Sequence, residues 1–160
     1  MNGPHRDWIA DASLVALAAI AVRLPFAAQT LWNGHVSRLA VAIGDPTAAP
    51  VPYAAGLLPV ARILHAVESD PVAIIVWLGI AAGAIAAVAT YVSARALAGV
   101  WPARLAAAAT VAFPPLWLAS VTGTVLVYVA LASALLGLTL VFLSARRSRV
   151  LAINTRFGFQ

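Results

Sequence analysis

The sequence contains no cysteine and no lysine, and only five of its 160 residues are acidic. The absence of cysteine excludes disulfides, thiolate metal sites and cysteine nucleophiles. Charge is scarce, since 9% of the residues are charged and 63% are hydrophobic, with a mean hydropathy of +0.97. This balance excludes an ordinary soluble domain. The ten arginines are spread between apolar runs, so the composition also predicts no nucleic-acid partner.

Long apolar runs dominate the rest of the sequence, and they have the length that a helix needs to cross the hydrocarbon core of a bilayer. We therefore predict an all-α integral membrane protein with four transmembrane helices in a single membrane domain. Pro114 and Pro115 are expected to end or bend the third span. The run Arg146-Arg147-Ser148-Arg149 is expected to stop the fourth span. The predicted spans are 8–28, 71–98, 103–119 and 125–144, with a juxtamembrane segment at 29–70 and a cytoplasmic tail at 145–160.

Two charged residues lie inside the first predicted span. In a helix, Arg23 lies about 22 Å beyond Trp8, so we expect its side chain to reach the far headgroups. Asp11 is expected to pair with Arg104 or with another arginine of the same membrane face. A proton relay through this single acid is the weaker alternative. The same charges argue against a cleavable signal peptide.

The juxtamembrane segment is the only long stretch that mixes charge, histidine, proline and aromatic residues, and we predict two short interfacial helices in it. The second helix is predicted from about Tyr53 to Val67, with a kink at Pro59. The first is amphipathic because its apolar residues recur on one face, namely Trp32, Val36, Leu39 and Ile43.

Two further patterns belong to the second predicted span. Ser69 or Asp70 is expected to cap its beginning, with Pro71 in the first turn. Gly79 and Gly83 then form a GxxxG ridge, which allows another helix to approach closely. We expect this ridge to pack inside the chain's own bundle, and a homo- or hetero-oligomer contact is the alternative.

The arginines predict the orientation of the chain in the membrane. With a cytoplasmic amino terminus only Arg38 and Arg62 lie outside, which satisfies the positive-inside rule. The juxtamembrane segment is then extracytoplasmic, and the chain is predicted to be a multi-pass protein of the bacterial inner membrane. The arginines placed in the cytoplasm are Arg6, Arg95, Arg104, Arg146, Arg147, Arg149 and Arg156.

Candidate chemistry concentrates in the juxtamembrane segment, because polar side chains in so apolar a chain mark water, headgroups or substrate. Asp45 precedes a proline and is either a turn former or a catalytic acid. Arg38 and Arg62 are expected to contact lipid headgroups, and Arg62 together with His65 is the sharper candidate for binding a substrate phosphate. His35 and His65 lack an obvious third ligand, so we predict no metal site.

A series of short motifs runs through the chain in the order RLP, LWN, SRLA, GDP, P-x-PY, ARILHA, ARALAG and PPLWL. This order resembles the amino-terminal part of GT-C-type membrane glycosyltransferases, such as protein mannosyltransferases and aminoarabinose transferases. The resemblance covers roughly residues 13–145. It includes one span, an extracytoplasmic loop with two juxtamembrane helices, and a tight arginine-bearing turn between the next two spans.

The resemblance implies sugar transfer from a polyprenyl-phosphate donor. In that family an Asp shortly after the first span acts as general base or metal ligand, and the matching triplet here is Trp32-Asn33-Gly34. Asn33 thus holds the family's catalytic position, although its amide cannot take a proton at neutral pH. The resemblance also places Tyr53 at the entry to the second juxtamembrane helix and Arg62 at a basic position within it. It implies no organic cofactor and leaves a divalent cation open.

Two functions therefore stay open. The first is a GT-C-like module that handles a polyprenyl-phosphate-linked sugar, as an active enzyme or as a truncated or catalytically degenerate one. The second is a non-enzymatic small membrane protein that packs against a larger membrane partner. The candidate site residues are Asn33 and Asp45 for catalysis, and Arg38, Tyr53, Arg62 and His65 for substrate binding.

Overall fold

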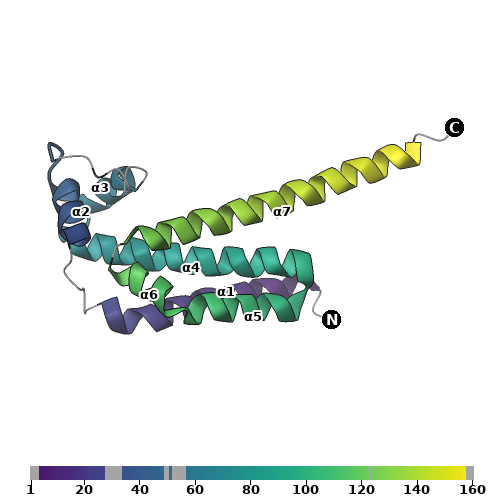
Figure 1. The fold of residues 1–160 in the computed structure, drawn as a ribbon, viewed down its shortest axis with the longest axis horizontal. Coiled ribbons are helices and arrows are strands. Elements are labelled where there is room, and N and C mark those ends of the chain that lie inside the picture. Colours follow the sequence, from purple (N-terminus) through teal and green to yellow (C-terminus); the bar gives the residue numbers. More distant parts are fainter. Residues whose placement is uncertain (1–3, 28–33, 49–50, 52–56, 123, 158–160) are drawn as a thin grey trace.

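The computed structural model describes residues 4–27, 34–48, 51, 57–122 and 124–157, and every regular element among them is a helix (Figure 1). Three of these helices contain stretches long and apolar enough to cross a membrane, and a fourth span results if the bent pair α5–α6 counts as one. The fold is therefore all-helical and compatible with a multi-pass membrane protein. The helices are α1 (Pro4–Ala27), α2 (Gly34–Gly44), α3 (Leu58–His65), α4 (Pro71–Ala98), α5 (Val100–Ala112), α6 (Pro114–Val121) and α7 (Val125–Phe157).

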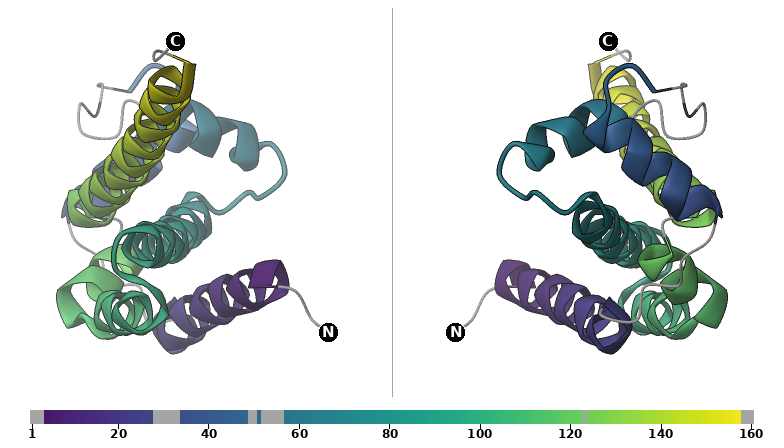
Figure 2. Two further views of the ribbon diagram at one scale, coloured as in Figure 1. Left: turned by 90° about the vertical axis from the view of Figure 1, so that its right-hand side faces the viewer. Right: turned by 90° about the vertical axis from the view of Figure 1, so that its left-hand side faces the viewer.

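Helix α4 is the centre of the molecule and contacts every other helix. Seen along the long axis, it lies between α1 and α5 on one side and α7 on the other (Figure 2). The short helices α2 and α3 cover the end where α4 begins (Figure 1). Most of the buried residues of α4 are alanine, glycine or β-branched, and small residues let neighbouring helices approach closely.

The predicted beginning of α4 is confirmed. Asp70 is the N-cap residue, and its Oδ1 accepts a hydrogen bond from the backbone N–H of Val72 at 2.8 Å. Pro71 occupies the first turn, where a missing N–H costs nothing because that group has no intrahelical partner.

The predicted bend in the third span is also confirmed. Phe113 is extended, with ψ 107°, because the residue before a proline is pushed out of the helical region. Helix α5 therefore ends at Ala112, and α6 begins at Pro114 after a bend of 52°.

One predicted feature of the helices is wrong, and one helix is longer than its predicted span. Pro59 lies in the first turn of α3 rather than inside a longer helix, so it starts the helix instead of kinking it. The candidate fourth span ends at Arg146, close to its predicted end, although helix α7 itself continues to Phe157. Arginine is a good helix former, so the basic residues end the apolar stretch without ending the helix.

The GxxxG ridge of α4 is covered from within the chain. A Cβ atom on Gly79 would lie 1.9 Å from the carbonyl oxygen of Ser120 in α6. A Cβ on Gly83 would lie 2.8 Å from Nε of Arg23 in α1 and 2.8 Å from Oγ of Ser120. The expected packing inside the bundle is what the structure has, whereas an oligomer through these glycines stays a prediction.

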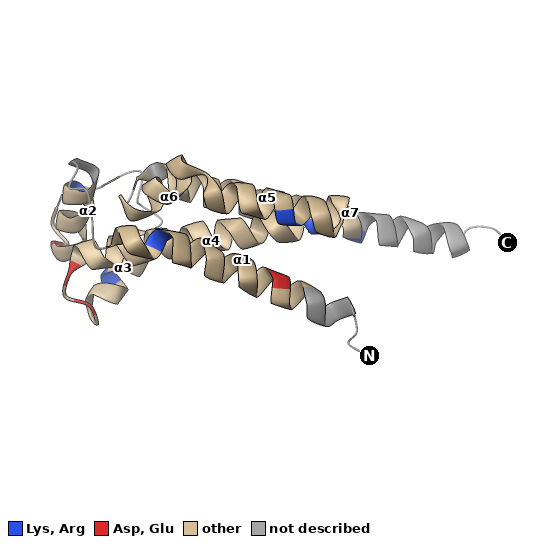
Figure 3. Cartoon of the chain, turned by 90° about the horizontal axis from the view of Figure 1, so that it is seen from below, with Lys and Arg blue, Asp and Glu red and all other residues tan. Residues whose placement is uncertain are grey.

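The two ends of the bundle differ in charge. The basic residues of α5 and α7 lie toward the end away from α2 and α3 (Figure 3). This distribution agrees with the arginine pattern from which the orientation was predicted, but which end faces the cytoplasm stays a prediction.

Single cysteines test that orientation directly, because the chain has none of its own. We expect an impermeant thiol reagent to label Ser37→Cys and Thr47→Cys in intact cells, and to label Ser148→Cys only after the membrane is opened. Labelling of Ser148→Cys alone in intact cells would invert the topology and remove the argument for an extracytoplasmic α2–α3 end.

Candidate functional site

The α2–α3 pair has its own small core, which fixes both helices on the beginning of α4. The apolar face predicted for the first juxtamembrane helix is confirmed at Val36, Leu39 and Ile43, which are all buried, while Trp32 lies outside the described residues. The remaining buried members of this cluster are Ala42, Val51, Ala61, Ile74 and Ile75.

Arg62 joins the two helices. Its Nε and Nη2 both donate to the carbonyl oxygen of Ala42, at 3.1 and 2.9 Å. Ala42 lies in the last turn of α2, where carbonyl groups lack an intrahelical partner, so the guanidinium caps that helix. Arg62 thus has a structural role that accounts for a basic residue at this position without a ligand.

Asp45 forms a turn directly after α2. Its Oδ1 accepts hydrogen bonds from the hydroxyl and the backbone N–H of Thr47, at 2.7 and 2.8 Å. These two bonds, with attraction from Arg62, hold the pKa of the Asp45 carboxyl below its usual value. Because Oδ1 is occupied by these two bonds within the turn, the geometry favours the turn-forming role over the catalytic one.

The other predicted site residues are only partly brought together. His65 ends α3, and its Nδ1 lies 3.1 Å from the carbonyl oxygen of Glu68. The Arg38 side chain is exposed on α2, and no hydrogen bond or ion pair involves it within the described part of the chain. Asn33 and Tyr53 lie outside the described residues.

No metal site emerges from these residues. Among the side chains that the structure describes, no three histidine, cysteine, aspartate or glutamate residues lie close enough to hold an ion. A divalent cation, which the family resemblance leaves open, therefore gains no geometric support.

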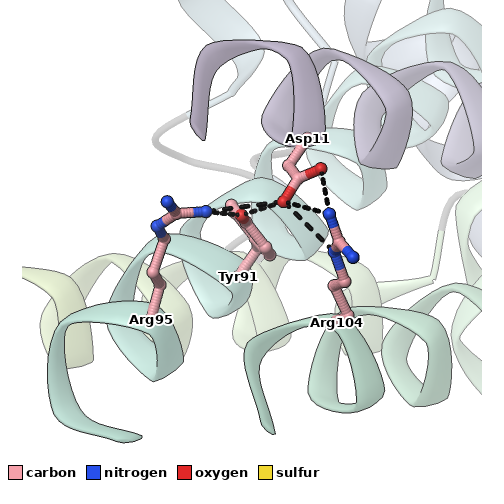
Figure 4. A network of polar contacts seen from close by, with 4 residues as sticks. All are labelled: Asp11, Tyr91, Arg95 and Arg104. Atoms are coloured by element: carbon pink, nitrogen blue, oxygen red, sulfur yellow. Dashed lines mark hydrogen bonds and ion pairs between the residues drawn. The ribbon is translucent and has the colours of Figure 1, made fainter. Parts of the chain in front are cut away.

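A polar cluster at the opposite end of the bundle is better ordered (Figure 4). Arg104 donates to Asp11 through Nη2 and Nε, with Nη2 lying 2.9 Å from Oδ1 and Nε 3.2 Å from Oδ2. The Tyr91 hydroxyl donates to Oδ2 of Asp11 at 2.8 Å. Arg95 donates to the Tyr91 hydroxyl and lies 3.4 Å from Oδ2 of Asp11. We call these four residues the Asp11 cluster.

The Asp11 cluster confirms the predicted pairing of Asp11 with Arg104. It joins three helices, because Asp11 lies on α1, Tyr91 and Arg95 on α4, and Arg104 on α5. The contact of Tyr91 with Asp11 was not predicted from the sequence, and Arg95 was predicted only as one of several arginines that could pair with Asp11. Their spacing of four residues, which places two side chains on one face of a helix, was the available signal.

A crevice of about 560 Å³ opens beside the Asp11 cluster. Polar atoms of Asp11, Tyr91 and Arg104 line one part of it. The other lining residues are apolar and come from α1 and α5, namely Leu14, Val15, Ala18, Ala107, Ala108 and Val111.

The prediction that the Arg23 side chain reaches the headgroups is wrong. Its side chain is 0% exposed instead of reaching the headgroups. Nη1 donates to the carbonyl oxygen of Ala19 at 2.6 Å, and Nε donates to Oγ of Ser120 at 3.1 Å. Nη2 has no partner in the described part of the chain. The missing side chain of Gly83 provides the space in which the guanidinium lies.

Comparison with known proteins adds no relative, because no family model, curated protein or solved structure matches this chain.

Proposed function

We propose that the chain is a multi-pass module of the bacterial inner membrane that binds a polyprenyl-phosphate-linked sugar at its α2–α3 end. In this proposal it corresponds to the amino-terminal part of a GT-C-type glycosyltransferase. The observation that carries the proposal is the α2–α3 pair itself. Its two amphipathic helices are folded against the beginning of α4 and carry Arg38, Arg62 and His65.

The packing of α2 and α3 supports a surface role for this end of the bundle. The pair buries one apolar face against α4, while Arg38 and Val41 of α2 and Ile63 of α3 remain exposed. A surface that combines exposed aliphatic side chains with a cation suits a ligand that has a long prenyl chain and a phosphate.

The structure changes which arginine is the better candidate for the phosphate. Two donor nitrogens of Arg62 are occupied by the Ala42 carbonyl, so replacing Arg62 would also disturb the end of α2. Arg38 is exposed, and its removal would break no hydrogen bond or ion pair within the described residues. We therefore assign the leading role in phosphate binding to Arg38 and a supporting one to Arg62.

We expect Arg38→Ala to weaken the binding of a radiolabelled polyprenyl-phosphate sugar by the purified chain about tenfold or more. A hydrogen bond to a charged group is worth roughly 1.5–3 kcal/mol, which corresponds to that ratio. Arg146→Ala is the matched control, because Arg146 is an exposed arginine on α7 near the other end of the bundle. It should leave binding unchanged.

Nanodiscs are the suitable medium, because the bilayer composition can be kept constant while the donor is titrated. Unlabelled polyprenyl phosphate should compete with the donor, and an excess of phosphatidylglycerol should not. Equal affinity of Arg38→Ala and Arg146→Ala, or displacement by phosphatidylglycerol, would contradict a dedicated donor site. The non-enzymatic alternative would then be favoured.

A further inference from the structure

We propose that the crevice beside the Asp11 cluster binds an anionic phospholipid, with its phosphate at Arg104 and one acyl chain along α1 and α5. This site lies at the other end of the bundle from the proposed sugar-donor site and shares no residue with it. The inference therefore does not depend on the proposed function.

The shape of the crevice suits an acyl chain. Helices α1 and α5 form its walls, and Tyr91 of α4 belongs to its lining. Space is available because Ala18, Ala107 and Ala108 present small side chains where larger ones would close the gap. Its volume of about 560 Å³ lies within the range of ordinary ligand sites.

The charge of the cluster suits a phosphodiester. Two guanidiniums share a single carboxylate, Asp11, so the cluster carries one positive charge in excess. The side chain of Arg104, which lines the crevice, is 49% exposed and therefore accessible to a ligand. A lipid phosphodiester carries one negative charge and would neutralise that excess.

Donor groups remain available for that phosphate. Arg104 uses Nε and Nη2 on Asp11, and Figure 4 shows its third guanidinium nitrogen outside these contacts. Arginine binds phosphate oxygens through several such donors at once. Asp11 holds the guanidinium in place and, by its own charge, would oppose the binding of a more highly charged anion.

The test compares two lipids that differ in headgroup charge. Purified protein is equilibrated in nanodiscs with equal amounts of phosphatidylglycerol and phosphatidylethanolamine of the same acyl chains. Lipids retained after mild detergent extraction are then counted by native mass spectrometry. We expect one phosphatidylglycerol to be retained about tenfold more than phosphatidylethanolamine, the ratio expected from one charge-assisted contact.

Two variants of neighbouring alanines locate the site. Ala108 lines the crevice and Ala109 does not, although both are exposed on the same helix. Ala108→Phe should abolish selective retention, whereas Ala109→Phe should keep it. Leu14→Trp provides a second obstruction from α1, since Leu14 lines the crevice and is 66% exposed.

Arg104→Gln tests the headgroup contact separately from the groove. It should remove the preference for phosphatidylglycerol while one lipid is still retained. Helix content measured by circular dichroism controls for folding in each variant.

The proposal is overturned if wild-type protein retains both lipids equally, or if Ala108→Phe and Leu14→Trp behave like Ala109→Phe. Displacement of phosphatidylglycerol by millimolar glycerol phosphate would also overturn it. That result would mean that the cluster binds a free phosphate and that the groove contributes nothing.

Discussion

Gly79→Ala is expected to lower the free energy of unfolding by about 3 kcal/mol, the upper end of the usual cost of overpacking. The added Cβ would lie 1.9 Å from the carbonyl oxygen of Ser120, and the next nearest atoms are also backbone atoms of that residue. A backbone carbonyl cannot rotate away as a flexible side chain can. Helices α4 and α6 must therefore separate, which loosens the packing at the centre of the bundle.

Gly137→Ala is the matched control for this substitution. Gly137 is also a helical glycine, but nothing lies within 4 Å of the Cβ that it would gain. Because alanine is the better helix former, Gly137→Ala should be neutral or stabilising by up to about 1 kcal/mol.

Unfolding of both glycine variants can be followed by tryptophan fluorescence during titration with dodecyl sulfate. Trp117 reports on the position of α6, since its ring stacks on Phe26 of α1 at 4.4 Å. Equal stability of the two variants would mean that α6 does not approach α4 as closely as the structure has it.

Arg23→Met is expected to raise the free energy of unfolding by about 2 kcal/mol, because replacing a buried charge by an apolar side chain of similar volume is often stabilising by 1–4 kcal/mol. In the described part of the chain no carboxylate pairs with Arg23, and its Nη2 has no partner. The substitution removes this unsatisfied group without creating another. The Ser120 hydroxyl still donates to the carbonyl oxygen of Leu116 at 2.9 Å.

Arg23→Lys tests whether stability depends on the positive charge of Arg23 or on the geometry of its guanidinium. The lysine ammonium keeps the charge but loses the planar fork that reaches both Ala19 and Ser120. We expect it to be less stable than wild type, while Arg23→Met is more stable. The same dodecyl sulfate titration measures both. Destabilisation by Arg23→Met would show that the guanidinium is satisfied in the membrane, by water or by a headgroup, and contributes to stability.

The sequence predicted the features that depend on nearby residues. The cap at Asp70, the bend before Pro114 and the buried face of α2 all follow from local backbone chemistry or from helical periodicity. The pairing of Asp11 with Arg104 was also predictable, because a carboxylate near the beginning of one span has few charged residues at the same depth.

The features that the sequence did not reveal depend on how two or more helices lie relative to one another. The burial of Arg23 requires the space at Gly83 and the hydroxyl of Ser120, which are far apart in the chain. The role of Arg62 depends on where the end of α2 lies relative to α3. Considered along one helix, Arg23 was expected to snorkel to the headgroups from the end of a span. Arg62 was expected to contact headgroups or a substrate phosphate from the juxtamembrane segment.

Gly99 alone connects α4 to α5, with a φ of 87° that favours glycine. A single residue cannot reach across a bilayer, so if α4 and the bent pair α5–α6 both span a membrane, they enter it together as a hairpin. The two helices are then inserted in one step and take up one common orientation. Arg95 and Arg104, on either side of the turn, must reach the same face of the membrane, and neither helix can invert without the other.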